Sequence, residues 1–217
     1  NYRCDYKGDY HMWQSTSTGT VSGIGTNVDL NFKIGSWNVN AYHTAAVSSV
    51  KLNKTSLGLK NGSSYTLKKS ISPSNAGNKN VSSSNKKVAV VSSSGKVTAK
   101  GVGKATITAK SSNGKKAACK VTVRPKTNKI KKLKKFGKKS IKITWSKVSG
   151  TTKYQIYMSK KKSSGFKRIK TASSKSASYT KKSLKRGRRY YFKVRSYKTV
   201  GKTKYYSSFS SVKSLKR

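Results

Sequence analysis

Apolar and polar residues alternate along most of the chain, and a period of two is typical of β-strands. In the stretch NVDLNFKIGSWNVNAYH, every second residue is apolar on either side of Gly35 and Ser36. This spacing is typical of a β-hairpin with one buried face. We therefore predict a hairpin within residues 1–46, whose apolar face packs on the domain that follows.

The region from Val47 to Val123 contains further short alternations, separated by turns of Gly, Ser and Asn. Strands of this length and spacing predict a β-sandwich. The apolar positions expected to form its core are Val88, Val90, Val97, Ala105, Ile107, Val121 and Val123.

The basic stretch RPKTNKIKKLKKFGKKSIKITW follows this region and allows two interpretations. Ile130, Leu133 and Phe136 have the spacing of a short amphipathic helix, the kind that binds membranes or partner proteins. Pro125 and Gly137 leave little room for a helix, however, and the alternation in SIKITW is that of a half-buried strand. We therefore favour an interdomain linker that runs into an edge strand, with lysines that face water and block edge-to-edge pairing.

The charge is distributed unevenly along the chain. The 217 residues have a net charge of +48, yet the three acids, Asp5, Asp9 and Asp29, all precede Val47, and none follows up to Arg217. A surface of one sign repels itself and opposes compaction. The bias therefore indicates a polyanionic partner, an unusual medium or a designed sequence. No run of 18 apolar residues is present, so we expect no membrane insertion.

The two cysteines are Cys4 and Cys119. An even count in a chain with the character of a secreted protein favours a disulfide between them. The alternative is two unpaired thiols, with Cys119 in a core. Cys4, Asp9, His11 and His43 are chemically able to bind zinc, but their spacing matches no familiar site. We predict no metal site and no cofactor.

Catalytic chemistry has few candidates in this sequence. Catalysis by paired carboxylates requires two acids, and the segment after Asp29 has none. A Ser-His-Asp triad would need His11 or His43, and no nucleophile elbow accompanies them. We therefore predict a protein that is not an enzyme.

Six short motifs in residues 47–123 carry a family resemblance. They are Leu52-Asn53, Ile71-Ser72-Pro73, Ser82-Ser83-Ser84-Asn85, Val88-Ala89, Gly95-Lys96-Val97-Thr98-Ala99 and Gly103-Lys104-Ala105-Thr106-Ile107-Thr108-Ala109. With them the segment resembles a bacterial immunoglobulin-like domain of group 2, which implies a β-sandwich. Members of that family usually have tryptophan where Val81 stands, and Trp37 of the predicted hairpin would fill the space.

The segment from Ile130 to about residue 215 carries a second resemblance. Trp145 ends the run IKITW, TKYQIYMS follows, and Leu184, Gly187 and Tyr190 precede FKVRSY. With these residues it resembles a fibronectin type III domain. The resemblance implies a tyrosine corner, in which the Tyr190 phenol bonds to the preceding loop, and it places Phe192 and Val194 opposite Trp145. Members often have acids where Gln155 and Lys181 stand, and the substitution removes surface partners for the lysines.

Together these patterns predict an all-β protein of two tandem immunoglobulin-like β-sandwiches with an N-terminal β-hairpin extension. The expected domains are residues 1–46, docked on the next domain, then 47–124 and 125–217. A start at Asn1 instead of methionine suggests a processed mature form or a trimmed chain. The resemblances imply a secreted or surface protein of bacteria, and we expect an extracellular or cell-surface location.

Exposed clusters of lysine and arginine are the main chemistry on offer, because such clusters bind polyanions by releasing counter-ions. The predicted polyanion-binding residues are Lys131, Lys132, Lys134, Lys135, Lys138, Lys139, Lys160, Lys161, Lys162, Lys181, Lys182, Lys185, Arg186, Arg188 and Arg189. The sequence leaves open whether these clusters share a face. Tyr190, Tyr191, Tyr205 and Tyr206 are able to stack on bases or sugars, but we favour a structural role for them.

We therefore predict a binding or adhesion module whose partner is a polyanion: a nucleic-acid backbone, a sulfated or sialylated glycan, or the teichoic acid of the wall. One alternative is a host protein, such as an immunoglobulin or glycoprotein, bound through Trp13, Trp37, Tyr42 and His43, because aromatic residues concentrate binding energy. Another is a structural subunit or decoration of a surface filament, wall or phage particle. The sequence does not fix the oligomeric state.

Overall fold

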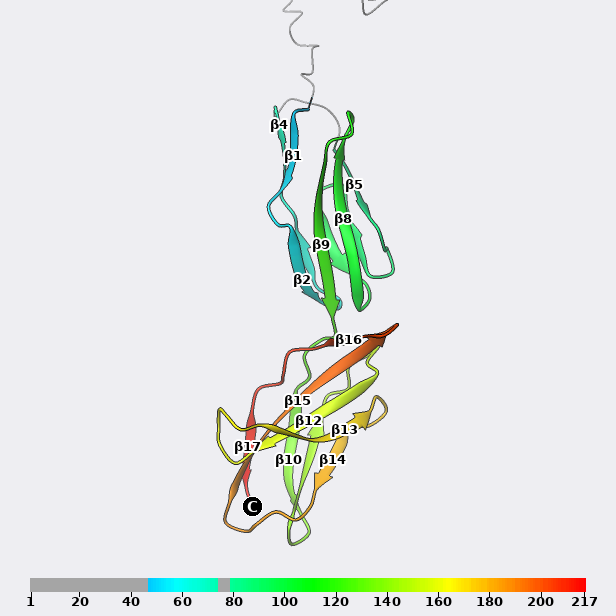
Figure 1. The fold of residues 1–217 in the computed structure, drawn as a ribbon. Helices are drawn as coiled ribbons and strands as arrows, with labels where there is room; N and C mark the ends of the chain where they lie inside the picture. Colours follow the sequence, from blue (N-terminus) through cyan, green and yellow to red (C-terminus); the bar gives the residue numbers. More distant parts are fainter. Residues whose placement is uncertain (1–46, 74–78) are drawn as a thin grey trace, which may run out of the picture. The chain divides into compact units, whose positions relative to one another are not determined.

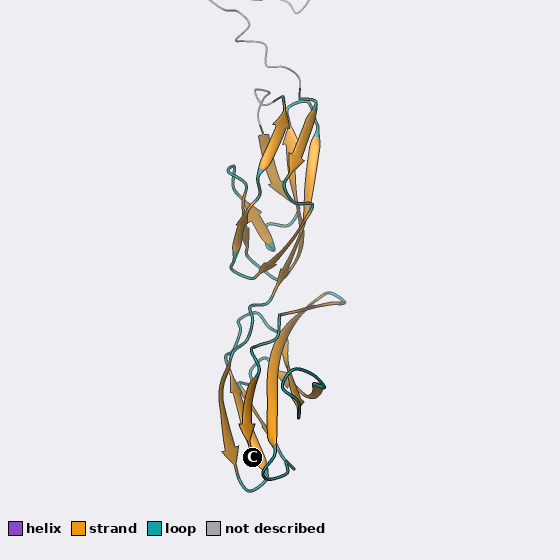
Figure 2. Cartoon of the chain, turned by 90° about the vertical axis from the view of Figure 1, so that its left-hand side faces the viewer, coloured by secondary structure: helices purple, strands orange, loops and turns teal. Residues whose placement is uncertain are grey.

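The computed structural model describes residues 47–73 and 79–217, which form two β-sandwiches (Figure 1). The predicted hairpin of residues 1–46 lies outside the described residues, and so does its docking on the next domain. Figure 2 shows strands and loops in the described part of the chain. No helix there is long and apolar enough to cross a membrane.

The described residues of the first sandwich form nine strands. They are β1 (Ser49–Leu52), β2 (Ser56–Lys60), β3 (Ser64–Thr66), β4 (Lys69–Ser72), β5 (Lys79–Ser83), β6 (Ala89–Val91), β7 (Lys96–Ala99), β8 (Gly103–Ser111) and β9 (Lys116–Arg124). One sheet has the order β2-β9-β8-β5, the facing sheet has the order β3-β7-β6, and β1 pairs with β4. β2 runs parallel to β9, whereas β8 pairs antiparallel with both of its neighbours.

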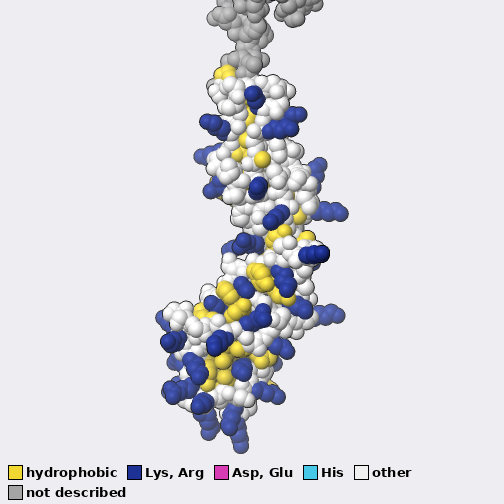
Figure 3. All heavy atoms as spheres, viewed as in Figure 1, with side chains coloured by type: hydrophobic (Ala, Val, Ile, Leu, Met, Phe, Trp, Pro, Cys, Tyr) yellow, Lys and Arg dark blue, Asp and Glu magenta, His cyan; other side chains and the backbone are white. Residues whose placement is uncertain are grey.

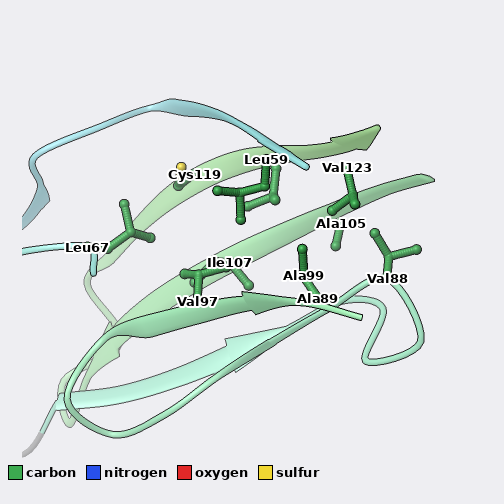
Figure 4. Close-up of a cluster of buried hydrophobic side chains, with 11 residues drawn as sticks. Leu59, Leu67, Val88, Ala89, Val97, Ala99, Ala105, Ile107, Cys119 and Val123 are labelled. Carbon is green, nitrogen blue, oxygen red and sulfur yellow. The ribbon is translucent and has the colours of Figure 1, made fainter. Parts of the chain in front are cut away.

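The core of the first sandwich is built from aliphatic side chains (Figure 4). In β8, buried residues alternate with more exposed ones, so that Ala105 and Ile107 point inwards, and β9 contributes Val121 and Val123. The alternation seen in the sequence therefore predicted these core positions. Val90 is only partly buried, because it lies on a strand of three residues at the edge of the smaller sheet.

The second sandwich contains eight strands. They are β10 (Ile130–Phe136), β11 (Ser140–Trp145), β12 (Lys153–Ser159), β13 (Lys167–Ser173), β14 (Ser178–Lys181), β15 (Arg189–Val200), β16 (Thr203–Tyr206) and β17 (Lys213–Lys216). One sheet has the order β10-β11-β14. The other has the order β13-β12-β15-β16, and β17 pairs with the first part of β15.

The core of the second sandwich combines large aromatic residues with aliphatic ones. Trp145, Tyr154 and Phe192 are fully buried, and the rings of Trp145 and Tyr154 lie 5.7 Å apart. Phe192 and Val194 belong to the same buried cluster as Trp145, as the fibronectin resemblance implied. The tyrosine corner is also present, because the Lys185 backbone N–H donates a 3.0 Å hydrogen bond to the Tyr190 hydroxyl.

The stretch around Leu133 is a strand, so the helical alternative is wrong. Ile130–Phe136 forms β10, which pairs with β11 alone in its sheet. The helical spacing of the three apolar residues does not mark a buried helix face, because of these residues only Ile130 is buried and Phe136 is 54% exposed. Backbone pairing with β11, not side-chain periodicity, fixes the conformation of this segment.

Candidate functional site

Two of the predicted basic clusters lie at the same end of the second sandwich. The β10–β11 turn contains Lys138 and Lys139, and the loop between β14 and β15 spans residues 182–188. Antiparallel pairing of β11 with β14 sets Ile141 opposite Lys181, which brings the start of one strand to the end of the other. The Leu184 N–H closes the arrangement by donating a 2.9 Å hydrogen bond to the Lys139 carbonyl.

The third cluster, Lys160 to Lys162, is at this end as well. It follows Ser159, which pairs with Tyr191 near the start of β15. The chain also returns here after β17, because the Arg217 N–H donates a 2.8 Å hydrogen bond to the Arg188 carbonyl. We call the turns 137–139, 160–166 and 182–188 the basic end of the second sandwich.

The opposite end carries fewer charges. Its turns 146–152, 174–177 and 201–202 hold three basic residues, Lys147, Lys175 and Lys202, and Lys129, Lys131 and Lys132 lie near them at the start of β10. The basic end holds nine: Lys138, Lys139, Lys160, Lys161, Lys162, Lys182, Lys185, Arg186 and Arg188. The charge density is therefore asymmetric along the strands.

The predicted polyanion-binding residues are exposed except for Lys181, which is half-buried on β14. Lys134 and Lys135 lie near the basic end of β10. Lys131 and Lys132 do not, because they follow Ile130, which pairs with Trp145 at the opposite end. Figure 3 shows Lys and Arg side chains across the face in view, and no acid occurs between Val47 and Arg217.

The main chain of the basic end is held by specific contacts. Leu184 is buried beneath the 182–188 loop, and the Tyr190 hydroxyl fixes the Lys185 backbone. Gly187 has φ +75° and donates a 2.6 Å hydrogen bond to the Arg217 carbonyl. The cations of this loop therefore extend from an anchored backbone, while their own side chains stay exposed.

The tyrosines considered for stacking differ in burial, and Tyr190 has the structural position favoured from the sequence. Tyr190 is buried in the core, and Tyr191, Tyr205 and Tyr206 are half-buried. Tyr206 packs at 5.3 Å from the ring of Tyr197.

Sequence reasoning missed a stack of cations and rings on the outer face of the β12-β15-β16 sheet. The Lys193 ammonium lies 4.2 Å from the ring centres of both Phe166 and Phe209. The Arg195 guanidinium lies 4.8 Å from Phe209 and 4.2 Å from Tyr206. Phe209 therefore sits between two cations, and the sequence signal was the alternation of Lys193 and Arg195 on one face of a strand.

Hydrogen bonds fix this cation–ring stack to the sheet. Arg195 donates from Nε to Gln155 Oε1 at 2.8 Å and from Nη2 to the Tyr157 hydroxyl at 3.1 Å. The Ser207 and Ser210 hydroxyls accept 3.0 Å hydrogen bonds from backbone N–H groups of β15. Both cations already face aromatic rings, so we assign this stack to the stability of the sandwich.

Cys119 forms no disulfide with another described residue and is fully buried in the core of the first sandwich. Burial raises the pKa of the Cys119 thiol above its ordinary value, and the charge of Lys54 opposes that rise. This position agrees with the alternative of a core thiol. The predicted partner Cys4 lies outside the described residues, and so do Trp13, Trp37, Tyr42 and His43 of the predicted protein contact. The disulfide and that contact stay predictions.

The fold defines the described chain as a pair of β-sandwich domains of the immunoglobulin-like class. Residues 46–121 match the sequence model of the bacterial Ig-like domain (group 2), and residues 131–213 match that of the fibronectin type III domain. The chain therefore carries a bacterial Ig-like domain followed by a fibronectin type III domain. Both families are non-catalytic and are typical of extracellular or surface proteins.

Solved structures with similar folds include the chicken CNTN1 FN1-FN3 domains, at 16% identity and a TM-score of 0.36 over 78% of this chain and 65% of that one. A cytokine receptor complex gives 12% identity and a TM-score of 0.48 over 77% of this chain and 96% of that one. Pectate lyase PelI from Erwinia chrysanthemi has 13% sequence identity and a TM-score of 0.31 over 41% of this chain.

The chain spans 65% of the CNTN1 fragment, 27% of PelI and 26% of a second pectate lyase, Pel3 from Pectobacterium carotovorum. A comparison with curated proteins found no match.

Proposed function

We propose that this protein is a non-enzymatic, extracellular or cell-surface binding module whose basic end engages a polyanion. The observation that supports this most directly is the convergence of three basic turns at one end of the second sandwich. These turns are far apart in sequence, and strand register brings them together. Neither the pairing of the strands nor the burial of the core requires lysine or arginine at these exposed positions.

The physical basis of binding is the release of counter-ions. A polyanion carries a condensed layer of small cations, and each group that a lysine or arginine neutralises releases some of them into solution. Nine cations at one end give a high local positive potential, and no acid between Val47 and Arg217 reduces it. The anchored 182–188 loop also lowers the entropy lost on binding, because its backbone is already ordered.

The partner is defined by its chemistry as a polymer with closely spaced phosphate, sulfate or carboxylate groups. Extracellular DNA, sulfated or sialylated glycans and teichoic acid all have this property. The exposed Lys and Arg side chains of the turns suit such polymers, since they reach successive charges without a fixed pocket.

A pair of charge-matched variants tests this proposal. The first changes Lys185, Arg186 and Arg188 of the basic end to Gln, and the second changes Lys147, Lys175 and Lys202 of the opposite end to Gln. Each variant loses three exposed positive charges, so the two have the same net charge.

We expect the basic-end variant to elute from heparin at clearly lower salt than the opposite-end variant. On duplex DNA its log affinity against log salt should lose up to about 2.7 in slope, because each lost phosphate contact contributes about 0.9. Equal elution of both variants would show that binding follows net charge alone and would refute a site at the basic end. Elution of the unchanged protein below physiological salt would refute polyanion binding altogether.

A further inference from the structure

The outer face of the β2-β9-β8-β5 sheet in the first sandwich has a hollow over Gly58. Strand register sets Gly58 beside Thr122, and Thr122 beside Lys104. The hollow measures about 690 Å³ and is open to solvent. Ser56, Thr106, Lys120 and Arg124 also line it.

The absence of a side chain at Gly58 helps to form this hollow. A Cβ atom built at Gly58 would meet no other atom within 4 Å, so the space above the strand is open. The backbone there does not have the positive φ that would require glycine. Neither packing nor backbone conformation therefore explains glycine at this position, whereas room for a ligand does.

Three cations surround the floor of the hollow. Lys120 and Arg124 flank Thr122 on the same face of β9, each about 7 Å from it along the strand and about 13 Å from one another. Lys104 lies across from Thr122 on β8. All three side chains are exposed. The cations repel one another, and an anion in the centre would relieve that repulsion.

Hydroxyl groups complete the lining. Ser56 and Thr106 lie on either side of Lys120 in the sheet register, and Thr122 lies between Lys120 and Arg124. The described residues hold no acid that could compete for these donors. Lysine, arginine and hydroxyl donors around one open space are the groups that bind tetrahedral oxyanions.

We infer that this hollow is an anion site of the first sandwich that takes a phosphate or sulfate group. It is separate from the basic end, which belongs to the second sandwich, and it does not depend on the function proposed there. Arg124 would hold two oxygens of the anion, because its planar guanidinium matches that geometry. Lys120 and Lys104 would supply the remaining charge.

A change at Gly58 tests the geometry without changing any charge. Gly58→Val places a branched side chain that suits a strand on the floor of the hollow, and Ser82→Val is the matched control. Ser82 is exposed on β5, which is the other edge strand of the same sheet, and it does not line the hollow. Both variants add apolar volume to the same face.

The measurement is an amide NMR titration of the full chain with inorganic triphosphate, which reports on each residue separately. We expect saturable shifts at residues 56–58, 104 and 120–124, and binding at least about tenfold weaker in Gly58→Val than in Ser82→Val. Shifts at the basic end are counted separately, so failure of one site leaves the other testable. The absence of saturable shifts around Gly58, or equal affinity in both variants, would overturn the inference.

A second variant guards against unfolding of the first. Lys120→Gln with Arg124→Gln keeps the hollow and removes two cations, and it should lose the same shifts while amides of the core stay unchanged. Retention of full affinity in this variant would also overturn the inference. Parallel titrations with inorganic phosphate and with an oligonucleotide identify the source of the group. Shifts with phosphate indicate a free anion, and shifts with the oligonucleotide alone indicate a polymer.

Discussion

The two sandwiches have cores of different kinds. The first is filled by small aliphatic side chains such as Val97, Ile107 and Val121, with aromatic Tyr65 only at its margin. The second adds large rings, including Trp145 and Phe192, to its aliphatic side chains. Their outer faces differ in the same way, since the first presents hydroxyls and lysines and the second presents the cation–ring stack.

What the sandwiches share beyond their fold is a surface of positive charge without acids. Two cores so different in chemistry do not both require the same surface, because surface residues contribute little to sandwich stability. The common charge is therefore a property of the surface and not of either fold. This contrast supports a role for the charge outside the fold, as proposed above.

The largest expected effect separates the two cores. Phe192→Ala should lower the free energy of unfolding of the second sandwich by ~4 kcal/mol, because it leaves a large cavity beside Trp145. Ile107→Ala should lower the free energy of unfolding of the first sandwich by ~3 kcal/mol. Calorimetry of the full chain measures both. A loss at Phe192 smaller than at Ile107 would break the comparison of ring and aliphatic cores.

A smaller effect concerns the cation–ring stack. Arg195→Met keeps much of the side-chain volume but removes the guanidinium between Phe209 and Tyr206, together with its bonds to Gln155 and Tyr157. We expect a loss of ~2 kcal/mol in the second sandwich, measured by denaturant unfolding. The control, Arg168→Met at an exposed position of β13, should change stability by less than ~0.5 kcal/mol. Similar losses in both would refute a stabilising stack.

A third effect tests the tyrosine corner that anchors the basic end. Tyr190→Phe removes the acceptor for the Lys185 N–H and should cost ~1 kcal/mol, because one hydrogen bond is lost. Hydrogen exchange at the Lys185 amide should accelerate as well. Tyr205→Phe, at a half-buried position on β16, serves as the control. Unchanged exchange at Lys185 would mean that the loop is held by other contacts.

The smallest expected effect is a pH dependence confined to the first sandwich. Because burial raises the pKa of the Cys119 thiol, the unfolded state loses this proton at lower pH than the folded state. The contribution of the Cys119 thiol to the stability of the first sandwich is therefore complete below the pKa of a thiol in the unfolded chain, about 8.5. It declines as the pH rises above that value. Denaturant midpoints between pH 7 and 9.5 measure the slope. Cys119→Ala should flatten it, and an unchanged slope would contradict the assignment to this thiol.

Much of the fold was predictable because local patterns reported burial directly. The alternation around Ile107 predicted the core of β8, and the fibronectin type III resemblance predicted the tyrosine corner at Tyr190. The segment at Leu133 was ambiguous, since its apolar spacing fitted a helix and only pairing with β11 decided the outcome.

The candidate sites were less predictable, because register brings their residues together. Whether Lys139, Lys160 and Arg188 share an end depends on the pairing of four strands, which the sequence does not display. Phe209 and Lys193 are likewise distant in the chain and adjacent in space. The hollow at Gly58 left no signal beyond one glycine in a short strand.

The lack of acids also has a consequence for the conditions under which this protein works. From Val47 to Arg217 the chain has no Asp, Glu or His, whose side chains are those that ordinarily change charge between about pH 4 and 7. Acidification or neutralisation of the surroundings therefore leaves the charge of this part of the chain constant. Dissolved salt, in contrast, weakens every one of its long-range attractions. Binding and release of a charged partner would therefore depend on the salt concentration and not on the pH.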